Sequence, residues 1–68
     1  MVEAAETLDR AERSRGQILA AARAEFIERG YSAASLNRII LASGLTKGGF
    51  YFHFPSKLAV AMAVLDEE

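Results

Sequence analysis

The sequence predicts an all-α fold of three helices followed by the start of a fourth. Apolar residues recur at helical spacing, hydroxyl residues stand where N-caps belong, and no segment shows the alternation typical of a strand. With 68 residues, the chain is one small domain at most. A domain of this size buries only about 60% of its unfolded surface, so we expect marginal stability.

The amino-terminal part of the chain divides into an arm and a first helix. Residues 1–9 are acidic and lack a strong period, and we expect a flexible arm there. The head domain, residues 10–55, begins with a helix. This helix has two possible starts, because two capping boxes fit. These boxes pair Asp9 with Glu12 and Ser14 with Gln17.

One apolar stripe identifies the first helix and its core-facing side. It consists of Ile18, Leu19, Ala22 and Phe26. Gly30 suits the residue of positive φ that closes a helix, and residues 31–34 are expected to form a short connection.

Two short helices follow. Ser35 is the expected N-cap of a helix over residues 36–42, whose buried side holds Leu36, Ile39 and Ile40. Gly44 breaks this pattern, and Thr46 is the expected N-cap of a third helix that ends at about His53. On that third helix we expect Phe50 and Phe54 to face the core, Gly48, Gly49 and Phe52 to face outward, and Tyr51 to lie on a flank.

The fourth helix occupies residues 56–68, with Ser56 as its N-cap. It is apolar around its whole circumference, which predicts burial on more than one face. We therefore expect the chain to be a fragment, with an absent C-terminal domain packing on Val60 and Val64. The fragment alone is expected to be monomeric.

The charges are segregated along the chain although the net charge is only −1. Residues 10–57 hold all 8 basic residues against three acidic ones, a balance of +5, and no acidic residue lies between Tyr31 and Lys57. This pattern suits a surface for DNA phosphates. The charge pattern leaves one alternative open, a helical protein-interaction module whose basic patch is incidental.

The composition offers little for other classes of function. The chain has no cysteine and a single histidine, so no metal site is expected. No apolar run approaches the roughly 18 residues of a membrane span. An enzyme is the weakest hypothesis, because no acidic residue lies between positions 29 and 65 to accompany His53. We expect no catalytic residue, no cofactor and no membrane partner.

The layout of the second and third helices predicts a helix-turn-helix unit, with Gly44 in the turn. Gly48 and Gly49 each cost a helix roughly 1 kcal/mol relative to alanine. Either they form a loop, or their missing side chains let the helix backbone approach the major groove, where its amides contact phosphate.

Residues 44–57, together with Gly30-Tyr31, carry a family resemblance. The run Gly-Leu-Thr-Lys-Gly-Gly-Phe-Tyr-Phe-His-Phe-Pro-Ser-Lys resembles the amino-terminal domain of the tetracycline-repressor (TetR) family, over about Arg15 to Leu65. Within that family it looks most like the γ-butyrolactone autoregulator receptors. The resemblance implies a bacterial cytoplasmic repressor, found on the nucleoid when bound. It also implies a homodimer joined through a C-terminal domain, a palindromic double-stranded operator and release by a small-molecule effector.

The resemblance also implies a set of DNA-binding residues. They are Ser35, Thr46, Lys47, Gly48, Gly49, Tyr51, His53 and Lys57. Lys47 matches a position that reaches bases or phosphates, and Gly48 matches one of close backbone approach. Position 49 often carries a small base-contacting side chain that Gly49 lacks, so base reading is expected to depend on Lys47. Phe52 stands where relatives often have tyrosine or tryptophan and has no polar atom for a phosphate.

Overall fold

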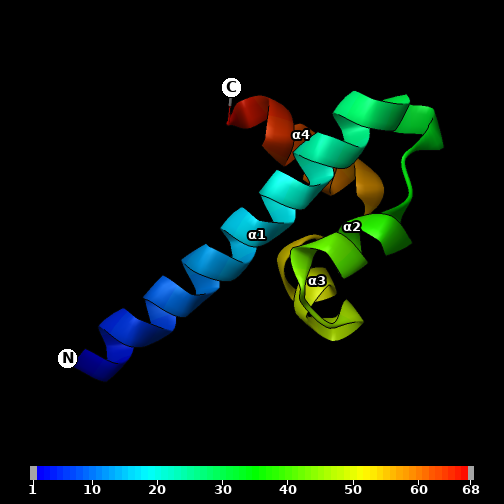
Figure 1. Cartoon of the computed structure of the whole chain (residues 1–68). Coiled ribbons are helices and arrows are strands. Elements are labelled where there is room, and N and C mark those ends of the chain that lie inside the picture. Colours follow the sequence, from blue (N-terminus) through cyan, green and yellow to red (C-terminus); the bar gives the residue numbers. More distant parts are fainter. Residues whose placement is uncertain (1, 68) are drawn as a thin grey trace.

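The computed structural model describes residues 2–67, with side chains from Arg10 onward. It contains four helices, α1 (Val2–Ala33), α2 (Leu36–Ser43), α3 (Lys47–His53) and α4 (Lys57–Asp66), and no strand within that part of the chain. The carboxyl-terminal half of α1 contacts both α2 and α4, and α3 lies beside α2 (Figure 1). The predicted all-α fold is confirmed.

The first helix is longer than either capping box predicts. It begins at Val2, since alanine and glutamate in the first residues are good helix formers. The side chains of residues 1–9 lie outside the described ones, and the flexibility of this arm stays a prediction. Gly30 adopts the expected positive φ of 77°, but its ψ of 166° makes a kink after which the helix continues to Ala33. The expected connection is therefore mostly a last helical turn.

All four helices contribute to one hydrophobic core. Its buried members are Ile18, Ala22, Ile39, Ile40, Phe50, Phe54, Val60, Ala63 and Val64. The stripe predicted for the first helix is confirmed at Ile18 and Ala22, whereas Leu19 and Phe26 are only partly buried against this core. Ile39 and Ile40 are buried as expected, and Leu36 packs at the edge.

The expected exposure of α4 is wrong at Val60. Val60 is fully buried and unavailable to a further domain, whereas Val64 is 9% exposed and lines the edge of an apolar groove. Their short side chains, with Ala63, let α4 approach α1 closely. The larger Leu58, Met62 and Leu65 stay exposed instead. With Phe26 and Tyr31 they line an apolar groove between α4 and the end of α1.

None of the helices within residues 2–67 combines the length and the apolar character that crossing a membrane requires.

Candidate nucleic-acid interface

The turn between α2 and α3 is fixed by short-range hydrogen bonds. Gly44 has φ 78° and ψ 6°, the left-handed region that favours glycine, and its N–H donates to the carbonyl of Leu41 at 3.2 Å. The buried Ser43 hydroxyl donates to the carbonyl of Ile40 at 2.7 Å and accepts from the N–H of Leu45 at 3.2 Å. Ser43 was not predicted from the sequence. A hydroxyl residue directly before a turn glycine was the available signal.

The three predicted N-caps are confirmed. The Ser35 hydroxyl accepts from the N–H of Arg38 at 3.2 Å, and the Thr46 hydroxyl accepts from the N–H of Gly49 at 3.0 Å. Ser56 caps α4 in the same way. A hydroxyl that accepts a backbone hydrogen bond keeps its own O–H as a donor. Ser35 and Thr46 therefore position α2 and α3 and retain a hydrogen that a phosphate oxygen could accept.

Aromatic packing determines which side of α3 faces the core. Phe50 is fully buried and Phe54 is 5% exposed, with ring centroids 6.2 Å apart, as the spacing predicted. Tyr51 packs edge-to-face on Phe50 at 5.4 Å. The guanidinium of Arg15 lies 5.4 Å from the centroid of the Phe54 ring, which ties the end of α3 to α1.

The opposite side of α3 is open to solvent. Lys47, Gly48, Tyr51 and Phe52 are exposed, and Gly49 and His53 are partly exposed. Both glycines are helical, so the hypothesis that they form a loop is wrong. A Cβ built at Gly48 would meet no atom within 4 Å, whereas one at Gly49 would lie 3.3 Å from the Thr46 hydroxyl oxygen. Packing within the fold therefore gives no reason for glycine at position 48.

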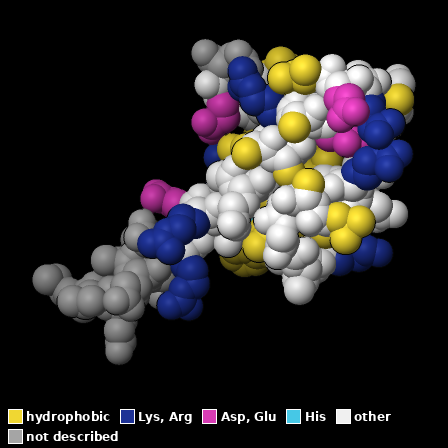
Figure 2. Space-filling model, viewed as in Figure 1, with side chains coloured by type: hydrophobic (Ala, Val, Ile, Leu, Met, Phe, Trp, Pro, Cys, Tyr) yellow, Lys and Arg dark blue, Asp and Glu magenta, His cyan; other side chains and the backbone are white. Residues whose placement is uncertain are grey.

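The charged side chains of the segment that contains α3 have one sign. On the face in Figure 2, acidic side chains lie along α1 and at the carboxyl end of α4, while the part over α3 shows hydrophobic and basic ones. The sequence holds no acidic residue between Tyr31 and Lys57. A phosphate approaching α3 therefore meets no nearby carboxylate from this segment.

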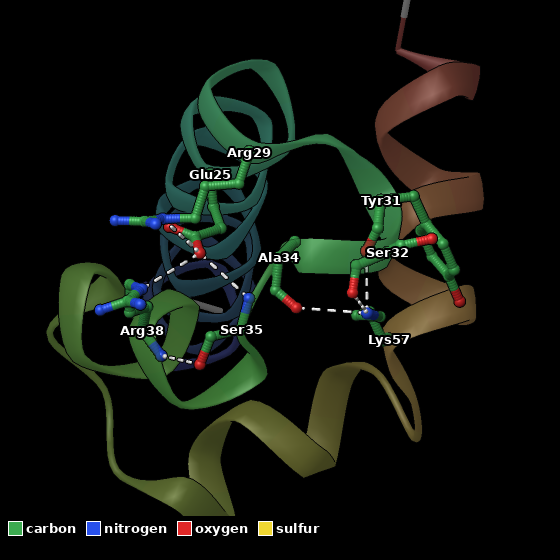
Figure 3. A network of polar contacts seen from close by, with 8 residues as sticks. All are labelled: Glu25, Arg29, Tyr31, Ser32, Ala34, Ser35, Arg38 and Lys57. Carbon is green, nitrogen blue, oxygen red and sulfur yellow. Dashed lines mark hydrogen bonds and ion pairs between the residues drawn. The ribbon is translucent and has the colours of Figure 1, made fainter.

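A buried carboxylate connects α1 to the start of α2 (Figure 3). Glu25 is 8% exposed, and its Oε2 accepts from the N–H of Ser35 at 3.0 Å. The same oxygen lies 3.3 Å from Nε of Arg29 and 3.4 Å from Nε of Arg38. The role of Glu25 was not predicted from the sequence. Glu25 follows Ile18 and Ala22 at helical spacing, so a polar residue in the apolar stripe was the signal.

Lys57 is directed toward α1 (Figure 3). Its Nζ donates to the carbonyls of Tyr31 at 2.8 Å, Ala34 at 3.2 Å and Ser32 at 3.4 Å, and lies 4.5 Å from the centroid of the Tyr31 ring. An ammonium has three hydrogens to donate, and these carbonyls can accept all of them. The structure therefore shows Lys57 capping the last turn of α1, and its predicted phosphate contact stays a prediction.

His53 contacts an aromatic neighbour at the end of α3. Its ring lies edge-to-face with that of Phe52, with centroids 5.1 Å apart. Among the described residues, no group of three His, Asp or Glu side chains could hold a metal ion.

A short helix, a glycine turn and a second short helix with an acid-free outer face define a helix-turn-helix domain of the DNA-binding class. The comparison with known families agrees, since residues 18–64 match the bacterial regulatory proteins of the tetR family. The chain belongs to the TetR family, and the resemblance found in the sequence is confirmed.

Curated relatives include proteins with opposite regulatory effects. The chain is 43% identical over 51 residues to the A-factor receptor protein of Streptomyces griseus, covering 75% of this chain and 18% of that protein. It is 48% identical over 51 residues to the transcriptional activator FasR of Mycolicibacterium smegmatis, covering 75% and 23%. It is 40% identical over 63 residues to the transcriptional repressor BepR of Brucella suis, covering 93% and 27%.

The chain thus spans about a fifth to a quarter of the length of these relatives. No solved structure matches it significantly.

Proposed function

We propose that this chain binds double-stranded DNA sequence-specifically by placing α3 in the major groove. The observation that carries the proposal is Gly48, which is helical, exposed and surrounded by open space where a side chain would stand. A helix with its side chains is about 10–12 Å wide, and the major groove is about 12 Å wide. A helical turn that lacks a side chain therefore lets the backbone of α3 approach the DNA most closely.

The contacts follow from the geometry around that turn. Lys47, in the first turn of α3, reaches base edges or phosphates with an unobstructed ammonium group. The hydroxyls of Ser35 and Thr46 donate to phosphates on either side, and Tyr51 and His53 contact the flanking backbone. Gly49 contributes its backbone only.

We propose a different role for Lys57. A phosphate contact would require it to give up one of three carbonyl partners, so its larger contribution is to hold α4 against α1. Lys57 therefore contributes to the interface indirectly, by fixing the position of α4.

We extend this proposal to a longer protein of which this chain is one domain. We infer a further C-terminal domain that dimerises the protein, covers the apolar groove formed by Leu58, Met62 and Leu65, and binds a small-molecule effector. The much greater length of the relatives supports it, and one of them is named a receptor. Two heads would then read a palindromic operator in successive major grooves. We further propose repression that the effector relieves, residence in the cytoplasm on the nucleoid, and no enzymatic activity.

Selection of preferred duplexes from a random pool, followed by titration at several salt concentrations, tests the proposal. Affinity for the selected duplex should fall as salt rises, because phosphate contacts release counterions. A complex that forms without salt dependence would contradict the proposal. It would favour the protein-interaction module instead.

A further inference from the structure

Phe52 is the most exposed aromatic side chain of the described residues, at 81%. An aromatic ring left in water forgoes the burial that favours folding. None of the contacts proposed above uses it, because it has no polar atom to offer a phosphate. Its position on α3 therefore needs another explanation.

The Phe52 ring lies on the same outward-facing side of α3 as Gly48, which has no side chain. Phe50, two residues earlier, is fully buried, so Phe52 points to the opposite side of the helix. Gly48 is four residues earlier and is therefore its neighbour on that side. The ring also packs edge-to-face with the ring of its sequence neighbour His53, at an interplanar angle of 85°.

The surroundings of Phe52 point to DNA as the partner. The helix-turn-helix unit that carries Phe52 also holds Thr46 and Lys47, and no acidic residue lies between Tyr31 and Lys57. Phe52 does not line the apolar groove on α4, so it is not an extension of that surface. In the major groove, the exposed apolar group of a base pair is the 5-methyl of thymine, and phenylalanine is among the side chains that contact it.

We propose that Phe52 is a specificity-determining residue that recognises thymine through contact of its ring with the 5-methyl group. This inference rests on the proposed entry of α3 into the major groove. It gives the operator a base preference that Lys47 alone does not provide, because a lysine donates to acceptors and gains nothing from a methyl group.

Single replacement of each thymine by deoxyuridine in the selected duplex tests the inference, since it removes only the methyl group. For the wild-type chain, one or two positions in each half-site should bind about fourfold more weakly, the equivalent of ~0.8 kcal/mol for one buried carbon group. For Phe52→Ala, the thymine and deoxyuridine duplexes should bind equally. Phe52→Leu keeps an apolar side chain and should retain part of the difference.

Ile27→Ala is the matched control, because Ile27 is 76% exposed and lies on α1. It should keep the wild-type ratio between the two duplexes. Circular dichroism checks that both Phe52 variants fold. A selected duplex without thymine, or a methyl effect that persists in Phe52→Ala, would overturn the role of Phe52 and leave salt-dependent DNA binding intact. Absence of salt-dependent binding would overturn both proposals.

Discussion

Replacing Gly48 with alanine should stabilise the fold and weaken DNA binding. The position is helical, its φ is not positive, and a Cβ there meets no atom within 4 Å. Glycine costs a helix interior about 0.5–1 kcal/mol relative to alanine, and we take about 0.5 kcal/mol because Gly48 lies in the first turn. For a domain of this size, that gain raises Tm by about 2–4 °C.

The same methyl group should interfere with the groove. If the backbone at Gly48 touches DNA, an added methyl overpacks the interface, which costs about 1–3 kcal/mol in a well-packed environment. Affinity for the selected duplex should therefore fall by about 5- to 150-fold. Stability and affinity then change in opposite directions, a result that general damage to the fold cannot produce.

Thermal unfolding followed by circular dichroism and DNA titration followed by fluorescence anisotropy measure the two effects. Gly16→Ala is the matched control, because Gly16 is also helical and exposed and its added Cβ also meets nothing within 4 Å. It should be stabilised at least as much, by about 0.5–1 kcal/mol because Gly16 lies in a helix interior, and should bind DNA like the wild type. Unchanged affinity in Gly48→Ala would refute the close approach of the α3 backbone.

Three further substitutions test separate parts of the interface. Lys47→Ala should cost about 1–3 kcal/mol on the selected duplex if the contact is bidentate to a base, whereas a phosphate contact would weaken all duplexes equally and reduce the salt slope by about one unit. Glu25→Gln should lower the free energy of unfolding by about 1 kcal/mol in urea titrations. The value is modest because its partners Arg29 and Arg38 are partly exposed. As a control, Glu28→Gln removes the same charge at an exposed position and should leave the free energy of unfolding unchanged. Lys57→Met should also destabilise the fold by about 1 kcal/mol, through the lost carbonyl contacts, and leave the salt slope of DNA binding unchanged.

The local features of the fold could be predicted because each depends on a few adjacent residues. Ser35 and Thr46 cap helices through N–H groups three residues ahead, and Gly44 meets the φ requirement of its own turn. The inward side of α3 followed from the spacing of Phe50 and Phe54 alone.

The features that could not be predicted depend on where other helices lie. Because α4 is apolar on all sides, its sequence has no periodicity that shows which side is buried, that of Val60 and Val64 or that of Met62. Glu25 is buried because the N–H of Ser35, ten residues later, needs an acceptor at that place. The role of Lys57 likewise depends on the kink at Gly30, which presents the last carbonyls of α1 to α4.

These tertiary contacts meet in one short part of the molecule. Glu25 holds the start of α2 to α1, and nine residues further along, Ala34 and the last turn of α1 accept the ammonium of Lys57 from α4. The helix that leads to α3 and the helix α4 are therefore fastened to the same end of α1. Since packed helices shift as units, a displacement of α4 against α1 would strain the attachment that also fixes α2. The orientation of the side of α3 proposed to face DNA thus depends on residues that need not touch DNA, and substitutions at Glu25 and Lys57 separate that dependence from direct contact.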